Sequence, residues 1–382
     1  MKTFLKKSIL LSLMLILFGI AMPFASASDG FTDLYDSYVV GGNNGIPGRQ
    51  TGTTPPGSST TSVTYEPSGT VTSGPVNPLT GLPMSEVQAG RRPLAITLGN
   101  TTEALPMNGI SQADIIYEVL VEGGLTRMVA LYQDISNVGV IGSIRSARHY
   151  TAQIAESHDA IFISAGGSYL GYEEIEARGI THINELSANH NQMFQRQVHR
   201  IPGRTVLNYH SAITTGALAA EWMPRFDIRL EHRPNHMNAL SFVNDATPTF
   251  GGNAANVAVR FSAGKSSTFS YDHTSRVYTM RQFNMDFVDA NNNAPVTFNN
   301  LLILRTSVTA IPGDTAGLRE VVTTGYGMGF FVSGGMYTEI FWFRPDKSSP
   351  FVYALRDGSE LRLSQGRTYI GIIPDNMEVT FN

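Results

Sequence analysis

Residues 111–133 read SQADIIYEVLVEGGLTRMVALYQ, and the fold prediction depends on this stretch. Ser111 with Asp114 three residues later is typical of a helix N-terminus, and Gly123-Gly124 is typical of a helix end. Between them, apolar residues recur at helical spacing: Ile115, Ile116, Val119 and Leu120. The apolar run TRMVALYQ that follows is instead typical of a buried strand. A helix followed directly by a strand predicts a sheet covered by helices.

The segments on either side continue this alternation. Strand-like runs are RPLAITLG (92–99), VGVIGSI (138–144) and DAIFISAGG (159–167). Helical patterns cover Ser146 to Glu156 and SYLGYEEIEARG (168–179). Residues 77–225 are therefore predicted to form an α/β domain with a mixed sheet and covering helices.

After about Arg225 the pattern changes to short alternating runs separated by turns. Hairpins are predicted around Ser333-Gly334-Gly335 and around Asp357-Gly358. STFSYDHTSRVYTMR and NNLLILRTSV are typical of further strands. Prolines and charges mark residues 226–240 as a connector. Residues 241–382 are thus predicted to form a mostly antiparallel β C-terminal domain.

The N-terminus has the pattern of an export signal. MKTFLKK precedes an apolar stretch from Ser8 to about Met22, and Ala25-Ser26-Ala27 is a small-x-small cleavage pattern. Residues 1–27 are predicted to be a signal peptide, with an uncleaved membrane anchor as the alternative. Residues 28–76, rich in Gly, Ser, Thr and Pro, are predicted to be a flexible linker. We therefore expect a secreted or extracytoplasmic protein associated with the cell envelope, which touches the membrane only through an uncleaved signal segment.

Composition narrows the chemistry. The 382-residue chain has no cysteine, which excludes disulfides, thiol chemistry and a lipid-anchor cysteine. Removing residues 1–27 takes away three lysines and no acid, so the formal charge moves from −4 to −7. This sign disfavours nucleic-acid binding, which needs clustered cations. Lys265 and Lys347 are the two lysines left, and arginine, which pairs bidentately with carboxylate or phosphate, supplies the other cations.

The strand-to-helix junction at residues 140–156 is the main candidate site. Ser146 is predicted to cap the helix, with its free N–H groups beside Arg145 and Arg148. Such a junction either binds an anion or pairs with the protein's own acids. Arg127 is a further candidate ligand-binding residue, and a second turn between a strand and a helix adds three more: Gly166, Gly167 and Ser168.

Acidic residues supply the internal partners for these arginines. Asp114, Glu118 and Glu122 are spaced four apart and would line one helix face, with Arg127 close behind. This acidic cluster favours cation pairing over a metal site, because it lacks the glycine and Asp/Asn density of a calcium loop. The nine histidines contain no zinc-binding spacing, and no Gly-x-Ser-x-Gly elbow is present. No metal or cofactor is predicted, and catalytic residues stay unassigned.

Several motifs resemble one known family. NPLTGLP (77–83), SQADIIYEVLVEGGLTR (111–127), IGSIRSAR (141–148) and DAIFISAGGS (159–168) are similar, in the same order, to the N-terminal domain of the YerB-like bacterial family. Two C-terminal segments resemble its second domain. The resemblance implies an exported envelope protein with an α/β domain and a β-rich one, and implies no established activity. The chain departs from the family in lacking the lipidation cysteine and in having Ser143 where proline is expected. It also departs at RIPGRTVLNYHS (200–211), where the family tends to carry Pro-His-Asn.

These observations leave three functional hypotheses. The first is a non-catalytic envelope protein that binds an anionic cell-wall or lipid-linked ligand near Arg145 and Arg148. The second is a metal-dependent phosphotransferase or hydrolase acting on lipid-linked pyrophosphates, based on a faint similarity to the LytR-CpsA-Psr phosphotransferases, with Asp114 or Glu122 holding magnesium. The third is a protein-interaction scaffold, with protein partners unknown. We prefer the first, which makes the chain a binding protein rather than an enzyme.

Overall fold

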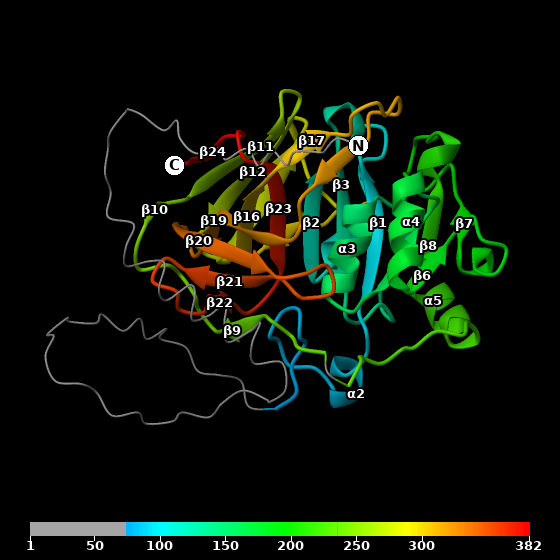
Figure 1. Cartoon of the computed structure of the whole chain (residues 1–382), viewed down its shortest axis with the longest axis horizontal. Coiled ribbons are helices and arrows are strands. Elements are labelled where there is room, and N and C mark those ends of the chain that lie inside the picture. Colours follow the sequence, from blue (N-terminus) through cyan, green and yellow to red (C-terminus); the bar gives the residue numbers. More distant parts are fainter. Residues whose placement is uncertain (1–73, 235) are drawn as a thin grey trace, which may run out of the picture.

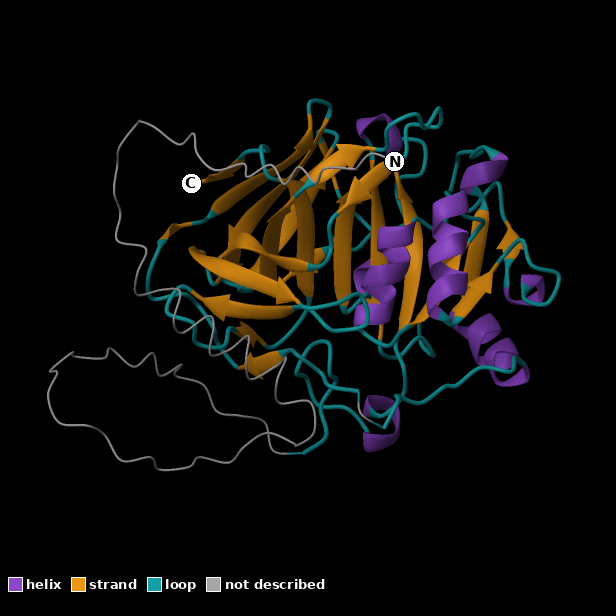
Figure 2. Ribbon diagram, viewed as in Figure 1, coloured by secondary structure: helices purple, strands orange, loops and turns teal. Residues whose placement is uncertain are grey.

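The computed structural model describes residues 74–234 and 236–382, so the predicted signal peptide and nearly all of the predicted linker lie outside the described residues. Within the described part, helices are too short or too polar to span a bilayer. Figures 1 and 2 show strands through most of the molecule, with the two longest helices, α3 (His149–Ser157) and α4 (Tyr169–Arg178), beside the N-terminal strands.

One large sheet runs through both sequence halves. Its strand order is β10-β20-β19-β16-β23-β2-β3-β1-β5-β6, with β21 beside β20. The late strand β23 (Thr368–Pro374) lies between β16 (Asn300–Thr306) and β2 (Ile115–Leu120) and is parallel to both. The α/β part and the β-rich part are therefore hydrogen-bonded into the same sheet.

The N-terminal part contributes the sheet's helix-covered half. Its central strands are almost uniformly apolar and fully buried, as expected when both faces of a sheet are covered. These central strands are β1 (Leu94–Asn100), β2 and β3 (Thr126–Tyr132). The N-terminal part also contains β5 (Ile161–Ser164), β6 (His182–Asn184), α2 (Glu86–Ala89) and α5 (Gly216–Trp222). A small separate sheet has the order β4-β8-β7, from Val140–Gly142, Ala212–Thr215 and Gln195–Arg196.

The C-terminal part adds a second layer. Strands β11 (Asn256–Ser262), β12 (Lys265–Asp272) and β13 (Val277–Gln282) centre a six-stranded sheet with β14 (Met285–Asp286), β15 (Thr297–Phe298) and β24 (Val379–Phe381). Phe261, Phe269 and Tyr278 of this sheet share one hydrophobic core with Tyr369 of β23. The other strands are β9 (Ser241–Val243), β10 (Gly252–Asn253), β17 (Val308–Ala310), β18 (Arg319–Val321), β19 (Gly325–Ser333), β20 (Met336–Arg344), β21 (Val352–Leu355) and β22 (Arg362–Ser364).

The predicted helix over residues 111–122 is wrong. The stretch forms strand β2, whose six residues are all buried, and 3-10 turns flank it at Ile110–Gln112 and Glu122–Gly124. Gly123 and Gly124 adopt positive φ angles of 67° and 73° and turn the chain into the antiparallel partner β3. Because β2 lies between two strands and is covered on both faces, its apolar residues satisfy both faces of a sheet, and this packing overrides the helical spacing.

Other local predictions have mixed outcomes. The helix predicted from Ser146 begins at His149, so Arg148 and not Ser146 occupies the N-cap position. Ser168 does cap α4, where its hydroxyl accepts the Gly171 N–H at 3.1 Å. The hairpin at 333–335 joins β19 and β20 as predicted. At 357–358 the chain turns as predicted, with an antiparallel bridge between Ala354 and Glu360 and the Leu361 N–H donating to the Tyr353 carbonyl at 3.0 Å. The longer pairings on either side of the turn are β21 with β20 and β22 with β9.

Candidate anion-binding junction

The two predicted anion-binding turns lie against each other. Arg145, Ser146 and Arg148 belong to the segment between β4 and α3, and Gly166-Gly167 belongs to the turn after β5. The Ala147 N–H donates to the Gly166 carbonyl at 2.9 Å. The Ser168 N–H donates to the Ala147 carbonyl at 3.1 Å. These backbone bonds hold the predicted ligand-binding residues in one neighbourhood.

Of the three candidate arginines, Arg127 and Arg148 lie within ion-pair distance of Glu122. Arg148 forms a bidentate ion pair with Glu122, with Nη2 to Oε2 at 2.7 Å and Nε donating to Oε1. Burial opposes ionisation of Glu122, but hydrogen bonding and the charge of Arg148 outweigh it and lower the Glu122 pKa. Arg127 donates to the Ser146 carbonyl at 2.8 Å and lies 3.9 Å from Glu122. Burial, followed by the charge of Arg148, lowers the Arg127 pKa to about 9.

Arg145 has a different environment. It is half-buried, donates to the Tyr209 carbonyl, and stands over the Tyr209 ring at 5.1 Å from the ring centre. Among the ion pairs of the described residues, none includes Arg145. Burial lowers its pKa from the usual value for arginine. Gly99 in β1 makes room for this side chain, because a Cβ there would lie 2.8 Å from Arg145 Cγ.

The Tyr209 ring lies beside Arg145, and Tyr172 and Leu186 lie beside the glycine turn. A Cβ on Gly167 would lie 3.1 Å from the Tyr172 ring, and one on Gly166 would lie 3.1 Å from Leu186. The Gly166 N–H is already used, since it donates to Asn184 Oδ1 at 3.0 Å. The large apolar side chains exposed in this region are Tyr169, Tyr172, Leu186, Leu207 and Tyr209. The junction thus presents one guanidinium without an acidic partner, bordered by aromatic rings.

The acidic row does not line a helix face. Asp114 accepts from Gln133 N at 2.7 Å and Asn77 Nδ2 at 3.0 Å, and burial raises its pKa to about 6. Glu118 is buried elsewhere, and both oxygens of Glu122 are held by Arg148. The three carboxylates therefore occupy three separate environments, which does not favour a shared magnesium ion.

Glu118 has a role that the sequence analysis missed. Its carboxylate is fully buried and lies 2.9 Å from Lys265 Nζ, across the boundary between the two sequence halves. Burial lowers the Lys265 pKa, while the charge of Glu118 opposes that shift. The groups that donate further hydrogen bonds to Glu118 are Asn100, Thr126, Ser267 and Tyr369. The sequence feature that could have pointed to this pair is the scarcity of lysine, because Lys265 is one of two lysines outside the predicted signal peptide.

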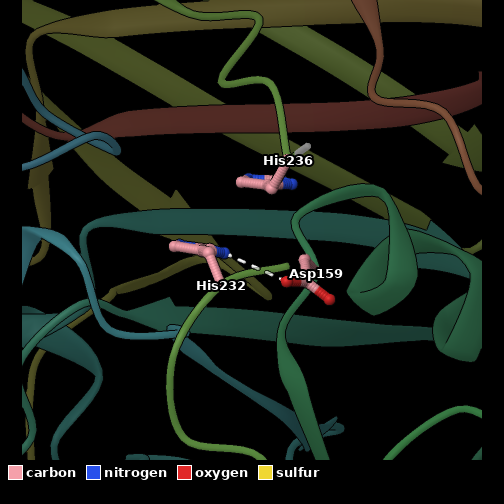
Figure 3. A group of neighbouring side chains, drawn as sticks. All are labelled: Asp159, His232 and His236. Carbon is pink, nitrogen blue, oxygen red and sulfur yellow. Dashed lines mark hydrogen bonds and ion pairs between the residues drawn. The ribbon is translucent and has the colours of Figure 1, made fainter. Parts of the chain in front are cut away.

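A third charged group involves the connector. Asp159, His232 and His236 offer ligand atoms within 4.8 Å of one another, the kind of set that can hold a metal ion (Figure 3). However, Asp159 is already paired with Arg229 at 2.6 Å and Arg233 at 3.2 Å, with Arg92 at 3.7 Å. Three guanidinium groups around one carboxylate repel a further cation. The arrangement fits an ion-pair cluster that fixes the connector better than it fits a metal centre.

The fold and this junction define a two-part protein in which an α/β half and a β-rich half share one sheet. Residues 79–221 match the model of the N-terminal domain of the protein of unknown function DUF3048, and residues 257–370 match the model of its C-terminal domain. The chain belongs to this DUF3048 family, which confirms the YerB-like resemblance.

One relative supports this assignment in both sequence and structure. A Bacillus subtilis (strain 168) protein named "Putative lipoprotein YerB" is 26% identical over 301 residues, covering 78% of this chain and 86% of the relative. The crystal structure of YerB from Bacillus subtilis matches with a TM-score of 0.67, and the match covers 80% of this chain and 99% of that one. The shared fold therefore includes both halves of the molecule.

Proposed function

We propose that this protein is an exported envelope protein whose N-terminal part binds an anionic cell-wall or lipid-linked ligand at Arg145. The observation that carries the proposal is the environment of this arginine, which is half-exposed and bonded to a carbonyl and an aromatic ring instead of a carboxylate. A guanidinium in that state keeps its fork available for phosphate or carboxylate oxygens.

Two further observations support the proposal. Arg127 and Arg148 share the single carboxylate of Glu122, so the junction keeps an excess of positive charge behind Arg145. The lipoprotein name of the Bacillus relative fits an extracytoplasmic location, which the export signal predicted for this chain also implies. In this proposal Arg148, which is paired with Glu122, positions the segment, and Arg145 contacts the ligand.

The test is a calorimetric titration of the purified protein with pyrophosphate, muropeptides and wall teichoic acid fragments. At least one anionic fragment should bind, and Arg145→Ala should weaken that binding tenfold or more. Arg281→Ala is the matched control, because Arg281 is an exposed arginine paired with Asp286 on the six-stranded sheet. Equal affinities of wild type and Arg145→Ala would refute the site.

A further inference from the structure

The structure contains a cleft whose residues are far from Arg145 in the sequence. It has a volume of about 330 Å³ and lies where residues 76–81, 238–242 and 360–365 meet. The last two segments include residues of the paired strands β9 and β22, which lie side by side along the lower side of the molecule in Figure 1. This volume is in the range of small-molecule and short-peptide sites.

The NPLTGLP motif builds one wall of this cleft. Asn77 Oδ1 accepts the Leu79 N–H at 2.8 Å, and the Asn77 carbonyl accepts the Gly81 N–H at 2.8 Å. Gly81 has a φ of +69°, and a Cβ there would lie only 2.4 Å from Phe242 Cβ, so glycine is required for this close contact. Gln365 Nε2 donates to the Gly81 carbonyl at 2.8 Å and ties the turn to the opposite wall. These hydrogen bonds and the close packing of Gly81 against Phe242 fix the position of this wall of the cleft.

The cleft carries two opposite charges on one segment. Arg362 is exposed and lines the cleft, and none of the ion pairs among the described residues includes it. Glu360, two positions earlier, also lines the cleft and accepts from the Ser241 hydroxyl at 2.5 Å. Leu240 and Phe242 add apolar surface between the walls.

Arg362 also borders a second depression. This depression is shallow, with a volume of only about 30 Å³; it is mostly apolar and includes Phe250, Phe331 and Leu361. Phe250 is 60% exposed, a high value for a side chain of that size. The Arg362 guanidinium thus lies at the rim of the cleft, next to an exposed apolar surface.

We propose that this cleft binds a short peptide with free termini. Its terminal carboxylate pairs with Arg362, its terminal ammonium pairs with Glu360, and an apolar side chain packs against Leu240 and Phe242 in the cleft. Residues two apart in an extended segment are separated by roughly 6.6 Å, which also suits the two ends of a di- or tripeptide. This site is independent of the anion site at Arg145.

The experiment titrates the full chain with an unblocked alanine–leucine–alanine tripeptide, followed by calorimetry and by NMR. We expect Arg362→Ala to weaken binding about tenfold. Amidating the peptide's C-terminus should weaken binding to wild type by a similar factor and leave binding to Arg362→Ala nearly unchanged. Glu360→Gln and N-acetylation of the peptide should show the same relation.

The control is Arg356→Ala, which removes an exposed arginine of the same region that pairs with Glu339 and lines neither cavity. This variant and Arg145→Ala should both bind the tripeptide as wild type does. Absence of tripeptide binding to wild type, or equal affinity in Arg362→Ala, would overturn the proposal. Either result leaves the anion site at Arg145 to its own test.

Discussion

At the scale of single residues, the sequence places Arg145 and Arg148 at one junction, but it does not show which of them pairs with a carboxylate. Arg145 and Arg148 are three apart and both lie at the junction, as predicted. Which of them meets Glu122 depends on the position of β2, a strand that the sequence pattern presented as a helix. Spacing along the chain can place two cations together, but tertiary packing decides which of them pairs with an acidic residue.

The two lysines outside the predicted signal peptide give a direct test of burial. Lys265→Met should destabilise the protein by about 3–5 kcal/mol, because it leaves the Glu118 carboxylate buried without its cation. Lys347→Met is the control, since Lys347 is 42% exposed and pairs with Glu174 at the surface, where such pairs contribute about 0–1 kcal/mol. Denaturant unfolding measures both, and similar losses would contradict the assigned role of Glu118.

Asp114 predicts a pH effect of definite sign. Because burial raises its pKa to about 6, the folded state holds this proton more tightly than the unfolded chain, where the pKa is about 3.9. The resulting stabilisation is complete below about pH 3.9 and disappears as the pH rises through 6. We expect the stability of wild type minus that of Asp114→Asn to increase as the pH falls from 7 to 4. A pH-independent difference in urea unfolding would argue against a raised pKa.

At the scale of elements, the sequence predicted buried strands more reliably than it predicted their partners. β1 and β3 are recognisable because each contains a run of mostly apolar residues. β2 was misread because a strand covered on both faces has no period of two, and its apolar residues also fit a helix. The glycines after it were read as a helix end, although they form a hairpin turn.

That hairpin turn predicts a contrast between two glycines. Gly123 has a φ of +67° and open space around its Cβ position, so Gly123→Ala should cost about 1 kcal/mol from backbone strain alone. Gly264 also has open space but no positive φ, and Gly264→Ala should be close to neutral. Thermal unfolding of the two variants compares them, and equal midpoints would show that the turn tolerates a side chain.

Asp159 is hydrogen-bonded to several residues of the connector, residues 226–240. Hydrogen bonds from His232, Arg229 and the Arg233 backbone overcome the opposing effect of burial and keep the Asp159 pKa well below its usual range. Asp159→Asn should therefore loosen the connector, which limited proteolysis would detect as faster cleavage within residues 226–240. The control is Asp286→Asn, whose carboxylate is 77% exposed. In wild type the same loosening should begin only in strong acid, since a depressed pKa gives stability that is lost as the pH falls through it.

At the scale of the whole molecule, the sequence indicated two consecutive parts, and the shared sheet connects them. Residues 368–374 cannot be recognised as the partner of residues 115–119 from local patterns, because the two segments are parallel and more than half the chain lies between them. The Glu118–Lys265 pair adds a charged contact across the same boundary. Long-range pairing of this kind determines both the strand order and the surroundings of the buried carboxylate.

This architecture predicts one cooperative unfolding unit. A fragment of residues 74–240 would lack β23, which exposes one edge of β2, and would also lack Lys265, which leaves Glu118 without its cation. We expect this fragment to show no cooperative thermal transition, and the full chain to show a single transition by circular dichroism and by tryptophan fluorescence. Mixing the fragment with residues 241–382 should restore part of the cooperative transition, since the missing strand and cation are then supplied together. Independent folding of residues 74–240 would mean that the shared sheet contributes little to stability.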